Sequence, residues 1–222
     1  MEEARRLQVT AWVVGLVGLA LVVGSVLWLR TGYVLSAVAS ESMTPTYAVG
    51  DRIVAERVDA DQVGRGDVVL YSAPERYYDG PPVMQRVIGV GGDRIVCCVG
   101  TGTARQRITV NGRPLSEPYV KGGIANGMPP YDVTVPEGRL FVLGDNRLNS
   151  RDSRSFATDH GGTVPVGAVV GRVTDSYAMP VLLAVATLLG LLLALAGLVL
   201  GVAARNVRRR PAARLTLWPE HF

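Results

Sequence analysis

Two long apolar runs and a central region of short ones make up the hydrophobic pattern of this chain. Residues 9–29 carry no charged side chain, and neither do residues 176–204. A helix rises about 1.5 Å per residue, so about 20 apolar residues cross the hydrocarbon core of a bilayer. The pattern therefore predicts two transmembrane helices, at 9–29 and 177–204.

The region between the two helices, residues 30–176, has the pattern of a β-rich domain. Its runs of β-branched and apolar residues are short, and turns containing glycine separate them, as is typical of strands. These runs are 52–58, 67–71, 83–90, 139–143 and about 168–174. We therefore expect a mainly β domain, antiparallel and barrel-like, between two transmembrane helices.

Residues from about 94 to 143 are predicted to form a second, smaller lobe inserted in this domain. Within it, the run 107–110 is followed directly by Asn111 and Gly112. Asn-Gly supplies the positive φ angles that a two-residue type I′ turn requires. A β-hairpin is therefore expected at this point of the lobe.

The distribution of charge predicts how the chain is oriented in a membrane. The net charge is +4 and the pI about 9.3, but acidic and basic residues nearly cancel between the apolar runs. The surplus lies after the second run, at Arg205, Arg208, Arg209, Arg210 and Arg214. By the positive-inside rule, the termini (1–8 and the basic tail 205–222) are cytoplasmic and the β domain is outside the cell membrane. This distribution indicates a lipid bilayer, and not a nucleic acid, as partner.

The first apolar run has an alternative interpretation as a cleavable signal peptide. Arg5 and Arg6 precede it, and Ala37-Val38-Ala39 imitates a cleavage site of small residues. However, the run is longer than a usual signal-peptide core, and cleavage there would leave Ser42 almost at a free terminus. We favour an uncleaved anchor.

The cysteine and histidine content is low. Cys97 and Cys98 are adjacent, and Cα atoms across a trans peptide are about 3.8 Å apart, below the usual disulfide range. We therefore expect a free or buried pair of cysteines. His160 and His221 fall on opposite sides of the membrane in this topology, so no metal site is predicted. No cofactor is predicted either.

Four short motifs follow one another in a fixed order along the chain. They are Ser40-x-Ser42-Met43-x-Pro45-Thr46, Gly50-Asp51, Arg86-Val87-Ile88-Gly89-Val90-Gly91-Gly92-Asp93, and Gly144-Asp145-Asn146-Arg147-x-x-Ser150-x-Asp152-Ser153-Arg154. In this order, directly after an apolar run, the set resembles type I signal peptidases. These are membrane-anchored serine endopeptidases that remove signal peptides from exported proteins. The resemblance covers most of the chain, from the first anchor to about Arg172.

The resemblance implies roles for the residues around the first motif. Ser42 would attack the scissile carbonyl as the nucleophile. The Ser40 hydroxyl and the Ser42 backbone N–H would donate to the developing oxyanion. Met43 would pack beneath the site.

The resemblance also implies supporting residues and a substrate. Asp152 and Arg154 would form an ion pair in the floor of the domain, Ser150 would hydrogen-bond the general base, and Arg86 would follow the base in sequence. The substrate would be the signal peptide of an exported preprotein, added in extended form to a sheet edge, with Ala or similarly small residues at alternate positions. The secretion machinery would be a further partner.

The chain departs from the family pattern at the general base. Members of the family use a Ser-Lys dyad, and the residue before Arg86, where the lysine would stand, is Gln85. A buried lysine can be a neutral amine that accepts the serine proton, whereas a glutamine amide has no comparable basic lone pair. Lys121 and His160 lie in predicted loops, where exposed side chains are expected rather than relocated bases.

These observations lead to three hypotheses of function. The first is a serine endopeptidase of the signal peptidase type, and the second is a binding protein that keeps the substrate groove without turnover. The third is a structural β domain on two anchors with no peptide groove, in which the motifs would coincide by chance. The motifs favour the first hypothesis, and Gln85 alone motivates the second.

Overall fold

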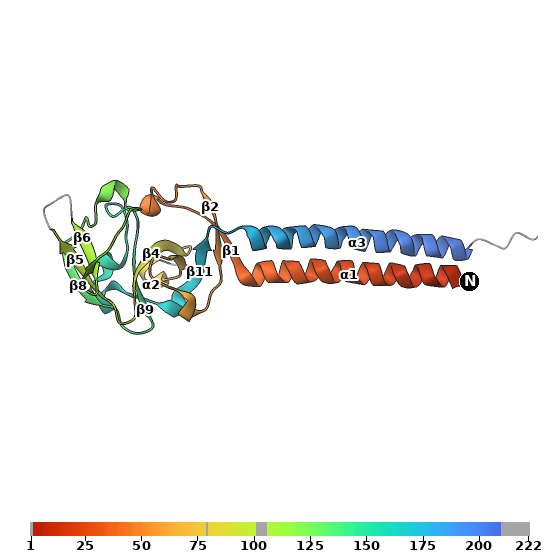
Figure 1. Cartoon of the computed structure of the whole chain (residues 1–222), viewed down its shortest axis with the longest axis horizontal. Helices are drawn as coiled ribbons and strands as arrows, with labels where there is room; N and C mark the ends of the chain where they lie inside the picture. Colours follow the sequence, from red (N-terminus) through yellow and green to blue (C-terminus); the bar gives the residue numbers. More distant parts are fainter. Residues whose placement is uncertain (1, 79, 101–105, 210–222) are drawn as a thin grey trace, which may run out of the picture. The chain divides into compact units, whose positions relative to one another are not determined.

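A computed structural model of the chain describes residues 2–78, 80–100 and 106–209 (Figure 1). The chain divides into two compact units, one made of its N-terminal and C-terminal helical segments and the other covering Thr31–Tyr177. The predicted basic tail lies outside the described residues beyond residue 209.

The helical unit consists of α1 (Glu2–Gly32) and α3 (Ala178–Arg209). Within them, Arg5–Gly32 and Ala178–Arg208 are long and apolar enough to cross a membrane. The predicted spans therefore coincide with helices, which extend several residues beyond the prediction at the N-terminal end of α1 and the C-terminal end of α3.

Small residues allow α1 and α3 to pack closely side by side (Figure 1). A Cβ atom built on Gly197 would lie 2.6 Å from the backbone nitrogen of Gly15 and 2.8 Å from the carbonyl oxygen of Ala11. Farther along the pair, the hydroxyls of Ser25 and Thr187 are hydrogen-bonded at 2.7 Å. Residue numbers rise on one helix as they fall on the other, so the helices are antiparallel. In lipid no hydrophobic effect drives helices together, so close contact between their backbones stabilises the pair instead.

Gly197→Val is expected to destabilise this helix pair by about 1–3 kcal/mol, because the added side chain meets backbone atoms of α1. The matched control is Gly24→Val, since nothing lies within 4 Å of a Cβ built at Gly24. Thermal melting of the full chain in a mild detergent, followed by circular dichroism, measures both. Equal melting temperatures for the two variants would contradict the packing argument.

The larger sheet of the β unit is antiparallel and open. Its seven strands have the order β1-β2-β11-β3-β4-β9-β10. Their bounds are β1 Tyr33–Ala37, β2 Arg52–Glu56, β3 Val68–Tyr71, β4 Val83–Val90, β9 Arg139–Leu143, β10 Val164–Pro165 and β11 Val169–Thr174. The expected antiparallel, mainly β fold is confirmed, and the sheet forms a half-barrel with β1 and β10 at its edges.

The second sheet is smaller and forms the predicted second lobe. Its order is β7-β6-β5-β8, with bounds β5 Arg94–Val99, β6 Arg107–Val110, β7 Arg113–Pro114 and β8 Tyr131–Thr134. Asn111 and Gly112 have φ angles of 52° and 78°, so the hairpin predicted between β6 and β7 is confirmed. The predicted lobe boundary at 143 is wrong, because β9 pairs with β4 and belongs to the larger sheet.

Short helices fill the connections between strands. The helix α2 covers Pro74–Tyr77, and the 3₁₀ turns are Glu41–Met43, Ala60–Gln62, Lys121–Gly123, Ser153–Phe156, His160–Gly162 and Val166–Ala168. A buried core around Val69, Val87 and Val142 supports the larger sheet. A second core around Ile95 and Phe141 joins it to the smaller sheet.

The expectation of a free cysteine pair is wrong. Cys97 and Cys98 form a disulfide within β5. The prediction used the Cα–Cα distance as its criterion, and the two sulfur atoms are joined although the Cα atoms are only 3.0 Å apart. Cys97 is buried in the core of the second lobe.

Candidate active site

A pocket of about 410 Å³ brings together residues from four strands of the larger sheet and from three loops. Ala37 of β1 and Gln85 of β4 both line it, although these strands are not neighbours in the sheet. The sheet must therefore curve around the pocket. Ser42, the predicted nucleophile, lines the same pocket.

Ser42 lies in the 3₁₀ turn Glu41–Met43 and is half-buried. Its hydroxyl oxygen is 3.0 Å from that of Ser40, and either group can be the donor. Met43 is fully buried beneath the turn, among apolar side chains that include Ile53 and Leu70. The turn is thus anchored from below, while the two hydroxyls remain beside the pocket.

Asn146, from the last motif, holds the Ser42 turn in place. Its backbone N–H donates to the carbonyl of Ser42 at 2.9 Å. Its side-chain amide donates to the carbonyl of Glu41 at 3.1 Å and to the hydroxyl of Thr44 at 3.2 Å. These bonds join two segments about a hundred residues apart in sequence, and they limit the rotation of the Ser42 backbone.

The neighbouring Asp145 connects the same two motifs to β4. Its carboxylate is fully buried and accepts two hydrogen bonds from the Arg86 guanidinium, at 2.9 and 2.7 Å. It also accepts from the hydroxyl of Thr46 at 2.5 Å. The Arg86 guanidinium lies over the ring of Tyr119, 4.0 Å from its centroid. Arg86 therefore fixes the strand position next to Gln85.

Gln85 is 1% exposed, and both ends of its side-chain amide have partners. The nitrogen donates to the carbonyl of Arg151 at 2.7 Å. The oxygen accepts from the hydroxyl of Tyr71 at 2.7 Å. No hydrogen bond joins Gln85 to Ser42 or Ser150 among the residues that the structure describes, and the buried Ser150 hydroxyl has no partner there. The bond from Ser150 that the resemblance implied is therefore not formed.

Two tyrosines surround the Gln85 amide but do not supply a base. Burial, reinforced by the neighbouring Tyr77, raises the pKa of Tyr71 far above its usual range. Burial likewise raises the pKa of Tyr77, against the lowering effect of its hydrogen bond with Tyr71. Both hydroxyls are protonated near neutral pH, so they serve as donors, with Tyr77 donating to the carbonyl of Arg151 at 2.8 Å.

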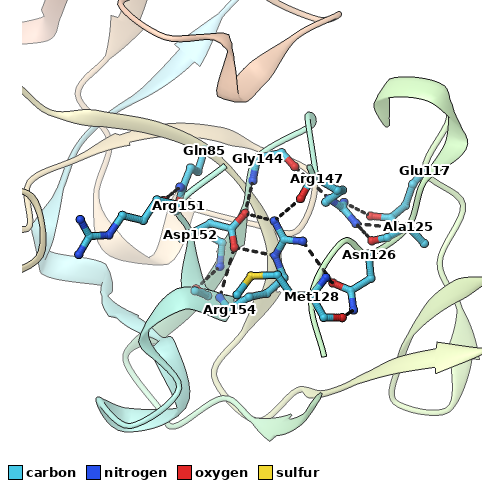
Figure 2. Close-up of polar contacts among 12 residues, drawn as sticks. Gln85, Glu117, Ala125, Asn126, Met128, Gly144, Arg147, Arg151, Asp152 and Arg154 are labelled. Atoms are coloured by element: carbon cyan, nitrogen blue, oxygen red, sulfur yellow. Dashed lines mark hydrogen bonds and ion pairs between the residues drawn. The ribbon is translucent and has the colours of Figure 1, made fainter. Parts of the chain in front are cut away.

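Asp152 and Arg154 form a buried ion pair, as Figure 2 shows. Nε and Nη2 of the guanidinium donate to the carboxylate at 2.8 and 2.7 Å. The carboxylate also accepts from the backbone N–H of Gly144 at 3.1 Å. Arg154 donates in addition to the carbonyl of Arg147 at 3.1 Å. Through Gly144 and Arg147, the pair thereby holds in place the loop that carries Asn146.

A second buried pair, which the motifs did not predict, extends this network (Figure 2). Arg147 and Glu117 are 2.5 Å apart and both side chains are buried. Arg147 also donates to the carbonyls of Gly144 and Ala125, at 2.9 and 2.6 Å. The motif contained Arg147, but nothing in the sequence indicated that its partner comes from the second lobe.

The two alternative bases are exposed, as expected. Lys121 is exposed at the start of a 3₁₀ turn. His160 is also exposed, and its ring nitrogen Nδ1 is 2.7 Å from a carboxylate oxygen of Asp159. Neither residue lines the pocket that holds Ser42.

Comparisons with known proteins identify relatives of this chain. Residues 7–178 match the family model described as signal peptidase, peptidase S26. Signal peptidase I of Mycobacterium tuberculosis is 34% identical over 185 residues, covering 61% of this chain and 61% of its own length. Probable signal peptidase I of Mycobacterium leprae is 31% identical over 192 residues, covering 61% of this chain and 65% of its own length. The match thus spans less than two thirds of these relatives.

Solved structures are also similar. A crystal structure of a signal peptidase I from Enterococcus faecalis is 29% identical and covers 51% of this chain and 97% of that chain, with a TM-score of 0.38.

Proposed function

This chain belongs to the signal peptidase family, peptidase S26, and from that premise we propose that it is a membrane-anchored serine endopeptidase of the signal peptidase I type. It cleaves signal peptides from exported preproteins at the outer face of the membrane. Ser42 is the attacking residue, and the Ser40 hydroxyl with the Ser42 backbone N–H stabilises the oxyanion. The observation that carries the proposal is the Ser40–Ser42 hydroxyl pair, held at 3.0 Å beside a pocket.

The substrate lies extended along the edge of the larger sheet. The strand β1 is at that edge, and its residues Ser36 and Ala37 line the pocket with Ser42. An edge strand offers unpaired backbone groups, so an added peptide strand gains hydrogen bonds and presents alternate side chains to the pocket. Apolar side chains such as Ile53 and Leu70 line the pocket and suit small residues like alanine.

The two long helices anchor the domain in the bilayer. We place both termini in the cytoplasm and the β domain outside, because the arginines at the C-terminal end of α3, such as Arg205 and Arg208, follow the positive-inside rule. This orientation puts Ser42 on the side where signal peptides emerge from the membrane.

The proposed enzyme turns over slowly because it lacks a general base at position 85. A glutamine amide does not accept the proton of a serine hydroxyl. Loss of a general base typically lowers a rate by about 10²–10⁴-fold. The remaining catalysis comes from the oxyanion donors and from the positioning of the peptide.

A second candidate function is favoured by the hydrogen bonds of Gln85. Its amide oxygen accepts from Tyr71 and its amide nitrogen donates to the carbonyl of Arg151, which is the behaviour of a residue that supports the structure. The chain would then bind signal peptides in the same groove without cleaving them.

The test is cleavage of a preprotein by the detergent-purified full chain. We expect slow release of a fragment cut after an Ala-x-Ala sequence, and no release by the Ser42→Ala variant. Ser116→Ala, at an exposed serine of the second lobe, is the matched control and should cleave like the wild type. Cleavage that persists in Ser42→Ala contradicts the assigned nucleophile. Binding of the preprotein without any cleavage selects the second candidate, and no binding contradicts both.

A further inference from the structure

We propose that Arg151 makes this site selective for substrates with an acidic side chain close to the scissile bond. The inference rests on the proposed function and names the class of peptide that the site takes. Arg151 lines the pocket around Ser42 and is the one charged side chain among the described residues that do so. The remaining lining is apolar or carries neutral polar groups.

The backbone of Arg151 is held firmly in the wall of the pocket. Its carbonyl accepts two hydrogen bonds, from the amide of Gln85 at 2.7 Å and from the hydroxyl of Tyr77 at 2.8 Å. The residue that replaces the family's lysine thus serves here to position Arg151. The side chain extends away from the neighbouring Asp152–Arg154 pair (Figure 2).

The guanidinium of Arg151 is preorganised by aromatic rings. It lies 5.0 Å from the ring centroid of Phe156 and 5.9 Å from that of Tyr77, within the range of cation–π attraction. The two rings pack edge to face at 5.7 Å. Stacking restricts the arginine side chain, so less conformational entropy is lost when a ligand binds it.

Arg151 differs from its arginine neighbours in having no carboxylate partner among the described residues. Arg76 also lies over Phe156, at 4.8 Å, but its charge is matched by Asp159 at 2.5 Å. Arg154 is matched by Asp152. Of these three arginines, Arg151 is therefore the one whose positive charge is left for a ligand, and a planar guanidinium suits the two oxygens of a carboxylate.

The expected selectivity is moderate, since Arg151 is exposed to solvent. A carboxylate in place of a neutral isostere should tighten peptide binding by about 3- to 10-fold, and the gain should shrink at high salt. Because Ser42 and Arg151 line one pocket, the acidic residue should stand within a few positions of the bond to be cleaved.

The experiment measures binding of fluorescent peptides to the full chain carrying Ser42→Ala, in detergent, by fluorescence anisotropy. Each peptide contains Ala-x-Ala, ends in an amide, and carries Glu, Gln or Lys at one of the positions flanking the scissile bond. We expect Glu to bind more tightly than Gln at one position, with the gain lost in Arg151→Gln. Arg151→Glu should reverse the preference towards Lys, which a loss of packing alone would not produce.

Arg113→Gln, at an exposed arginine of β7 in the second lobe, is the control and should keep the preference for Glu. Equal binding of the Glu, Gln and Lys peptides would overturn the role of Arg151 and leave the proposed function standing. The same peptides with a free C-terminal carboxylate are measured in parallel. A gain seen only with them would also overturn the role of Arg151, because the ligand would then be a cleaved end and not an acidic side chain. Absence of all peptide binding would overturn both proposals.

Discussion

Gln85→Lys is expected to raise the rate of preprotein cleavage by about 10²–10⁴-fold, the usual contribution of a general base. Position 85 is 1% exposed, and burial disfavours the charged form of a lysine, so its pKa falls towards neutral pH. A neutral amine at this position can accept the proton of Ser42, whereas the glutamine amide cannot. The change places a proton acceptor in the pocket that Ser42, the proposed nucleophile, also lines.

The surroundings of Gln85 suit a lysine side chain. Lysine is one bond longer than glutamine, so its nitrogen reaches farther into the pocket that residue 85 lines. Part of the hydrogen bonding survives, because the carbonyl of Arg151 still accepts from Tyr77 and the hydroxyl of Tyr71 still lies 3.1 Å from that of Tyr77. The buried hydroxyl of Ser150, which has no partner among the described residues, becomes a candidate partner for the amine.

The measurement is the initial rate of cleavage after Ala-x-Ala, with the wild type and Gln85→Lys compared at equal concentration across a range of pH. Gln85→Met is the control, since it has similar volume and no base and should not gain activity. Adding Ser42→Ala to Gln85→Lys should remove the gain. A folded Gln85→Lys protein that binds the preprotein but cleaves no faster would show that Ser42 is not placed to react with residue 85.

Asp152→Ala should destabilise the β domain by about 3–5 kcal/mol, the cost typical of breaking a buried ion pair by removing one partner. The Asp152 carboxylate is fully buried, and Arg154 beside it is 1% exposed at its side chain. Removal of the carboxylate leaves the guanidinium charged in a region of low dielectric. The backbone N–H of Gly144 loses its acceptor as well.

Asp132→Ala is the matched control, because Asp132 also forms a two-point ion pair with an arginine, Arg94. Both members of that pair are largely exposed, at 49% and 63% of their side chains, so its loss should change the stability of the domain far less than the loss of Asp152 does. Thermal and urea unfolding of the full chain in detergent compare the two variants. Similar losses of stability for both would contradict the role assigned to the buried network.

Local patterns in the sequence were sufficient where one segment decides its own structure. The two apolar runs are helices, and Asn111 and Gly112 have the positive φ angles that their residue types favour. Edge strands and lobe boundaries depend instead on a partner distant in sequence. The strand β1 was not predicted because it directly follows an apolar helix, and its identity comes from pairing with β2.

The sequence by itself determined the family motifs, the two long helices, and the absence of a lysine before Arg86, because residue identity and hydrophobic period need no coordinates. Only the tertiary structure decided what those residues touch: the Gln85 amide bonded to Tyr71 and Arg151, the pairing of Arg147 with Glu117, and the disulfide of Cys97 and Cys98. The physical reason is that hydrogen bonds and ion pairs act over about 3 Å. Which groups come within that distance depends on how the whole chain packs.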